Sequence, residues 1–225
     1  MISLNKEYAV VPMTVPVDNA GTLTSDIISL KNYNQAEIYI ATGAAFTKTA
    51  AVTVQQGNAV DSAATALAFT LYYETGMMLN YDGASSGVGA AAGETATGAG
   101  TGVMTILEDR NGILVGNKWN STAFVDNEVL TFSGGKTAVV DGIRYNEDIM
   151  VPTALAAAVN TFNITQVLDV NKLYMIPVNS SMLNAGMDCI ELNIADMDSP
   201  TLLAVWVILS QPRYAGTPMP TALYN

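Results

Sequence analysis

Short segments in which apolar and polar residues alternate limit most strongly what this chain can fold into. Gln35–Ala41 (QAEIYIA), Ala51–Gln56 (AVTVQQ) and Ala66–Tyr73 (ALAFTLYY) all alternate. Successive side chains of a strand point to opposite faces of a sheet, so this period of two predicts half-buried strands. The stretches between them are rich in Gly, Thr, Asn, Asp and Ser, as turns require.

A second cluster of predicted strands lies toward the C-terminus. Cys189–Ile194 alternates, with Ile190, Leu192 and Ile194 facing inward and Cys189 as a structural, unreactive thiol. Leu202–Leu209 lacks alternation and predicts a strand buried on both faces, against a sheet partner and a neighbouring subunit or layer, with a short buried helix as the alternative. Two further strands are predicted at Asn160–Ile164 and at Lys172–Val178, where Pro177 indicates a sheet edge or a strand end.

The segment between the two clusters has a different composition. Asp82–Gly102 is a low-complexity run of Gly, Ala, Ser and Thr, which predicts a mobile loop or arm. Strands are expected at Val103–Leu107, Glu128–Ser133 and Thr137–Val140, with turns at Asn111-Gly112 and Gly134-Gly135. A short helix is plausible only at Asp148–Val159.

These patterns predict an all-β fold, a jelly-roll-like β-sandwich with an inserted β-rich module or long loop. The sandwich is discontinuous, built from 22–75 and 152–212, and the insertion, a Gly-rich loop and β-hairpin module, spans 76–151. Residues 1–21 are expected to form an N-terminal arm and 213–225 an extended C-terminal tail.

Both ends combine apolar residues with prolines. Pro12 and Pro16 disfavour pairing inside a sheet, yet the surrounding residues are too apolar for a free tail. We therefore expect the N-terminal segment to be an arm that docks on a partner chain; the C-terminal end is either bound along a neighbouring chain or disordered. The candidate contact residues are Val10, Val11, Met13, Val15, Val17, Tyr214, Pro218 and Pro220.

The residues that most enzymes need are missing. The chain has no histidine, so a Ser-His-Asp triad is impossible, and its single cysteine excludes an internal disulfide and a multi-thiolate zinc site. Two acidic groups offer oxygen ligands for a hard cation: Glu108 and Asp109 with Asn111, and Asp196 with Asp198. Neither has calcium-loop spacing, and solvated turns explain both, so we expect no enzyme activity, cofactor or metal.

Charge and hydropathy restrict the partners. The net charge is −11, and the nine basic residues are scattered, so nucleic-acid binding is not expected. Charged residues make up only 13% of the chain and hydrophobic residues 50%, without an apolar run long enough to span a membrane or a signal-peptide stretch near the N-terminus. Burial against other protein chains accounts for this composition; a compact monomer with a neutral polar surface is the alternative.

Two stretches resemble a known group of proteins. Leu30–Phe69 contains KNYNQAEIYIATGA and AAVTVQQGNAVDSAATALAF, and Lys172–Tyr214 contains MDCIELNIADMDSP, LLAVWVIL and SQPRYAG. Together they resemble the head decoration, cement or minor capsid proteins of tailed bacteriophages. The resemblance covers the two flanking clusters and leaves 76–151 outside it, with its role open.

The resemblance implies a structural virion protein that stabilises the outer capsid surface. It implies binding to the major capsid protein as a homo-oligomer, often a trimer, over capsomer junctions. Two alternatives stay open. One is a tail, neck or fibre component, or the major shell protein itself, although the long helix usual in that protein is not predicted. The other is a carbohydrate-binding jelly-roll module or adhesin in which Tyr72, Tyr73 and Tyr81 form a stacking platform.

Overall fold

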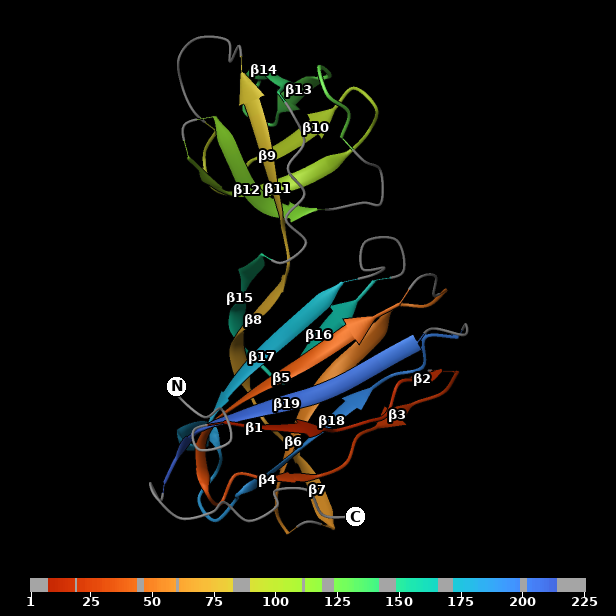
Figure 1. Cartoon of the computed structure of the whole chain (residues 1–225), viewed down its shortest axis with the longest axis vertical. Coiled ribbons are helices and arrows are strands. Elements are labelled where there is room, and N and C mark those ends of the chain that lie inside the picture. The colour runs from red at the N-terminus through yellow and green to blue at the C-terminus, as the bar shows by residue number, and fades with distance from the viewer. Residues whose placement is uncertain are drawn as a thin grey trace, which may run out of the picture. The chain divides into compact units, whose positions relative to one another are not determined.

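The computed structural model describes an almost entirely β-stranded protein. It covers residues 8–18, 20–43, 47–59, 61–82, 90–110, 112–118, 124–141, 149–165, 172–198 and 202–213. Within these ranges the only helical element is a single 3-10 turn, η2 (Ser180–Met182). The prediction of an all-β sandwich is therefore confirmed (Figure 1).

The chain divides into two compact units. The described residues up to Tyr73 and from Pro152 onward form the first unit, and Glu74–Val151 form the second. Sequence analysis placed an insertion at 76–151. Two strands carry the chain across the division: β8 (Phe69–Thr75) on the way out and β15 (Met150–Val159) on the way back.

The first unit contains two sheets, which we call sheet A and sheet B. Sheet A has the order β1-β19-β5-β17-β8-β15, with β2 also paired to β19. Its remaining strands are β1 (Ala9–Pro12), β2 (Val17–Asp18), β5 (Tyr33–Thr42), β17 (Leu173–Asn179) and β19 (Leu202–Pro212).

Sheet B has the order β16-β6-β18-β3, with β4 also paired to β18 and β7 to β6. Its strands are β3 (Leu23–Thr24), β4 (Ile28–Ser29), β6 (Ala50–Ala59), β7 (Ser62–Ala66), β16 (Thr161–Ile164) and β18 (Cys189–Ile194).

The two sheets enclose one hydrophobic core. From sheet A, Ile38 and Ile40 of β5 contribute side chains with no exposed surface, and Val207 of β19 lies beside them in register with Ile38. From sheet B, Ile190 and Ile194 are equally buried and belong to the same cluster. Fully burying a side chain of this size stabilises the fold by about 1.5–3 kcal/mol. The inward positions expected for Cys189–Ile194 are confirmed.

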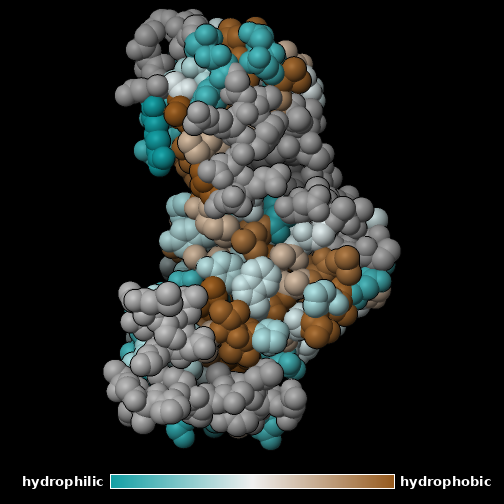
Figure 2. All heavy atoms as spheres, viewed as in Figure 1, coloured by the Kyte–Doolittle hydropathy of each residue, from teal (hydrophilic) through white to brown (hydrophobic). Residues whose placement is uncertain are grey.

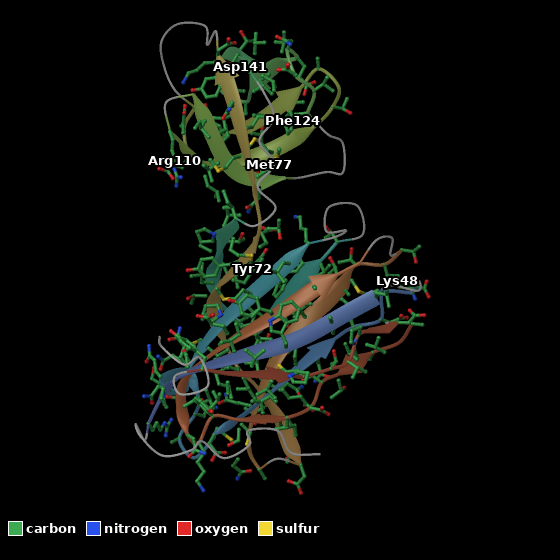
Figure 3. The ribbon with its side chains drawn as sticks, viewed as in Figure 1. Lys48, Tyr72, Met77, Arg110, Phe124 and Asp141 are labelled. Carbon is green, nitrogen blue, oxygen red and sulfur yellow. The ribbon has the colours of Figure 1, made fainter. Side chains whose placement is uncertain are left out.

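The second unit is a closed antiparallel barrel with the order β10-β11-β12-β9-β14-β13. Met77 and Phe124 belong to its interior cluster (Figure 3). Gly116 allows β12 to approach β11 closely, because a Cβ there would collide with the Thr105 carbonyl. The strands are β9 (Met77–Asp82), β10 (Thr95–Gly98), β11 (Val103–Asp109), β12 (Ile113–Lys118), β13 (Val129–Phe132) and β14 (Thr137–Val140).

Two expectations for the middle of the chain were wrong. The loop expected at 82–102 contains strand β10, which pairs with both β11 and β13, so backbone pairing overrides its weak strand propensity. The helix expected at 148–159 is strand β15 over Met150–Val159, which lies beside β8 in sheet A; residue 148 lies outside the described part of the chain. The hairpins expected at the Asn-Gly and Gly-Gly pairs are confirmed by the β11–β12 and β13–β14 pairings.

Pro177 does not mark a sheet edge. It lies within β17, which has β5 on one side and β8 on the other, and it stands opposite Glu37. A proline removes one backbone donor, but the other six residues of this strand also stand in register with β5. Of the two positions that Pro177 indicated, the sheet edge is therefore wrong.

The N-terminal stretch is not a free arm in this chain. β1 pairs with β19 from Ala9↔Leu209 to Pro12↔Trp206, and β2 continues along the same neighbour. Pro12 fits because β1 is the last strand of sheet A. Val11 and Met13 consequently lie in the chain's own core.

Candidate interaction surface

The outward side of sheet A is apolar, and we call it the outer face. In β19 the buried residues are Leu203, Val205, Val207 and Leu209, so the residues between them point away from the core. Those positions are occupied by Leu202, Ala204, Trp206 and Ile208. The neighbouring strands add Val10, Pro12, Glu37, Tyr39, Ala41, Leu173, Met175 and Pro177 in register with them. Apolar residues gather over these strands in Figure 2.

The strand expected at Leu202–Leu209 is present as β19, and the burial of its second face against a neighbouring subunit or layer stays a prediction. The chain itself buries only one face of the strand, since Leu202 is 65% exposed and Ala204, Trp206 and Ile208 are half-buried. An apolar run therefore arises here from an inward face that fills the core and an outward face that nothing in the described chain covers.

Tyr39 and Trp206 lie at the centre of the outer face. Their rings stack in parallel across β5 and β19, with centroids 5.5 Å apart and planes 4° from each other. The Tyr39 hydroxyl donates to the Glu37 carboxylate at 3.0 Å. Burial and this carboxylate raise the pKa of Tyr39 to about 12, so it remains a neutral phenol at physiological pH. Glu37 is the only charged residue among the positions of β1, β5, β17 and β19 that define the face, and Asp18 of β2 stands opposite Leu202 at its margin.

Sheet B presents a different surface. Its outward residues are mainly polar and bonded to one another: the Thr24 hydroxyl donates to the Asn193 side chain at 2.7 Å, and the Thr53 and Thr161 hydroxyls lie 3.0 Å apart. Glu191 is buried beside them, and burial raises its pKa. Solvated faces of a sandwich normally carry such polar residues, so the outer face of sheet A is the exception.

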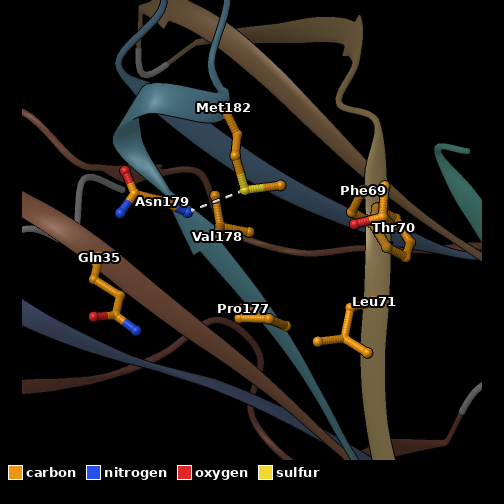
Figure 4. A pocket seen from close by; sticks show the side chains of 8 residues that line it. All are labelled: Gln35, Phe69, Thr70, Leu71, Pro177, Val178, Asn179 and Met182. Carbon is orange, nitrogen blue, oxygen red and sulfur yellow. Dashed lines mark hydrogen bonds between the residues drawn. The ribbon is translucent and has the colours of Figure 1, made fainter. Parts of the chain in front are cut away.

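A small pocket opens beside the outer face. Its volume is about 220 Å³, and it lies between β17 and β8, lined by Gln35, Phe69, Thr70, Leu71, Pro177, Val178, Asn179 and Met182 (Figure 4). The Asn179 backbone N–H donates to the Met182 sulfur at 3.3 Å. The lining contains no charged side chain and no general acid or base, so the pocket can hold an apolar group but offers no catalytic chemistry.

Both acidic groups proposed as cation ligands have protein partners. Glu108 forms an ion pair with Arg110 at 2.8 Å, which lowers the pKa of that carboxyl, and Asp109 accepts from the Tyr81 hydroxyl at 2.6 Å. Asn111 lies outside the described residues. Lys48 reaches Asp196 at 3.2 Å and Asp198 at 3.0 Å. Across the described ranges, no three His, Cys, Asp or Glu side chains are grouped as metal ligands.

Cys189 lies where sequence analysis placed a structural thiol. Its side chain is buried, and it donates to the Asp188 carboxylate at 3.2 Å. Burial is the main reason that its pKa rises to about 12, and the Asp188 carboxylate adds to it. Because the thiolate is the nucleophile, this environment keeps the residue unreactive.

Two of the three tyrosines named for a sugar platform, Tyr72 and Tyr81, pack against other aromatic rings of their own units. Tyr72 stacks on Phe162 at 4.3 Å and lies near Tyr174, so it packs against the sandwich core. Tyr81 belongs to the barrel unit, where it packs edge-on against Phe132. The rings of Tyr72 and Tyr81 therefore both pack against other residues of the fold.

The candidate contact residues fall into four groups. Val11 and Met13 lie in the core, Val10 and Val15 are 69% and 74% exposed, and Val17 is half-buried in β2. Tyr214, Pro218 and Pro220 lie outside the described residues. Sequence reasoning missed the residues of β5, β17 and β19 that form the outer face. The available signal was the run of apolar residues at Leu202–Leu209, which predicted burial on both faces but did not show that the outward face extends over β5 and β17.

Comparisons with known proteins leave the family open. No protein-family model matches the chain, and no curated protein matches it. Nor does the described part of the chain contain a helix with the length and apolar character needed to cross a membrane.

Proposed function

We propose that this chain is a structural virion protein that decorates and stabilises the outer surface of a bacteriophage capsid as an oligomer. The observation that carries the proposal is the outer face of sheet A, which is apolar and which no other described part of the chain covers. Contiguous apolar patches of this kind mark protein–protein interfaces. The resemblance of the flanking strand clusters to phage decoration proteins supplies the capsid as the assembly.

The strand order supports a jelly roll for the sandwich. When β1, β3, β5, β6, β16, β17, β18 and β19 are numbered from one to eight, sheet A begins 1-8-3-6 and sheet B has 2-7-4-5. This is the order in which a long hairpin of eight strands rolls into two four-stranded sheets, the arrangement found in viral capsid and lectin domains. The barrel unit then lies in the connection between the fourth and fifth strands.

Stabilisation of a capsid would follow from mass action. A protein that binds only the assembled shell shifts the equilibrium toward that state, and many copies on a lattice make modest contacts collectively strong. The net charge of −11 suits a surface turned away from packaged nucleic acid.

Particles made with and without the gene test the proposal. We expect electron microscopy to show added density on the outside of heads that contain this protein. Particles that contain it should also survive heating better than particles that lack it. Purified protein added to particles that lack it should co-sediment with them and restore their heat tolerance. Normal heat tolerance without the gene, together with no binding on add-back, would overturn the proposal, and density on the tail would favour the tail or fibre alternative.

A further inference from the structure

We propose that the outer face of sheet A binds the same face of a second copy of this chain, forming a two-fold symmetric pair. The proposal deepens the structural role above by naming the surface through which copies associate. It rests on the chemistry of the face, its size, and the availability of the partner.

The chemistry of the face is that of an interface between permanent partners. Such interfaces are apolar and poor in charge, whereas the surfaces of transient complexes resemble ordinary protein surface. Here the outward positions of four adjacent strands carry aliphatic, aromatic and proline side chains, and the one carboxylate among them, Glu37, accepts a hydrogen bond from Tyr39. The flat Tyr39–Trp206 stack offers the aromatic anchor that dominates binding at many interfaces.

The size of the face fits a stable pair. Four strands about 4.8 Å apart, over seven residues of about 3.3 Å each, cover about 450 Å² of flat sheet. A standard interface buries about 800 Å² of accessible surface per partner, with an apolar centre and a polar rim. The outer face provides that centre, and Gln35, Asn179 and Asp18 stand at its margins.

Availability favours a second copy over a capsid protein as the occupant. An apolar patch of this size on a free chain promotes association before any particle is encountered. A second copy is present wherever the chain is made, and it offers an identical flat surface. Two identical faces meet about a two-fold axis, whereas a trimer needs two different surfaces on each copy.

Solution mass with charge-adding variants tests the pairing. Light scattering should give twice the chain mass for the unaltered protein. Val10→Glu and Ile208→Glu place carboxylates on the face, and the mass of each variant should fall to that of one chain. Val10 is 69% exposed, so its variant keeps the fold, which far-UV circular dichroism verifies. Asn163→Glu adds the same charge to the exposed side of sheet B and should leave the pair intact.

Each other outcome overturns the pairing: a monomeric unaltered protein, a trimer, or a pair that survives both substitutions on the outer face. Co-sedimentation with particles that lack this protein tests the proposed capsid role separately from the pairing. A pair that binds no particle would retain the inference and remove the capsid role, whereas a monomer that binds particles would do the reverse.

Discussion

Cys189 shows how the surroundings of a residue can suppress its reactivity. Its thiol is buried on β18 beside Asp188, which raises its pKa to about 12 from an ordinary value of 9.0. We therefore predict that a maleimide or a disulfide reagent at pH 8 labels the native protein far more slowly than the urea-unfolded protein. Ser181→Cys, at an exposed position of η2, is the control and should react rapidly in the native state. Rapid labelling of native Cys189 would contradict the buried environment.

Gly186 is required by its backbone conformation and not by crowding. Its φ is +84°, within a turn closed by the Met187 N–H donating to the Asn184 carbonyl at 2.9 Å, and a Cβ there would meet no atom within 4 Å. Side chains other than glycine are strained at positive φ, by about 1–2 kcal/mol. Gly186→Ala should therefore lower the free energy of unfolding in urea by about 1 kcal/mol. Gly21 has the same open space without a positive φ, so Gly21→Ala should leave stability unchanged.

At the scale of elements, β19 contains its own matched pair of positions. Leu203 is fully buried in the core and its neighbour Leu202 is 65% exposed. Leu203→Ala should lower the free energy of unfolding by about 2–5 kcal/mol, because it leaves a cavity. In the Val10→Glu background, where the chain is expected to be single, Leu202→Ala should change it by less than about 0.5 kcal/mol, as at an ordinary surface position. Urea unfolding followed by circular dichroism measures both, and similar losses at the two positions would contradict the register of β19.

The same strand shows what the sequence can and cannot predict. Alternation in β5 and β18 identified both strands and their inward residues, because one side of each is polar enough to contrast with the core side. In β19 both sides are apolar, so the pattern has no contrast; it predicted burial of both faces but not the extension of the outward face over β5 and β17. β15 was predicted as a helix because alanine favours helices locally, and its pairing with β8 depends on residues far away in the chain.

At the scale of the whole molecule, the sandwich is closed by pairings between distant parts of the chain. β1 lies beside β19, and β3 beside β18, so the first strand of each sheet along the chain pairs with the last strand of that sheet. No local pattern carries that information, which is why residues 9–12 were expected to form an arm. Long-range pairing of this kind also slows folding, because the loop-closure entropy must be lost before the contacts form.

The division into two units predicts that the sandwich does not need the barrel. β8 and β15 are neighbours in sheet A, and beyond them the Gly76 N–H donates to the Ile149 carbonyl at 2.9 Å, so the two crossing strands remain side by side. Replacing residues 76–149 with Asn-Gly should therefore close a hairpin between Thr75 and Met150. We expect the shortened chain to unfold cooperatively in urea and to keep the mass of a pair, since β1, β5, β17 and β19 all belong to the first unit. A shortened chain without a cooperative transition would show that the sandwich depends on the barrel, and a folded monomer would place part of the self-association in the residues removed.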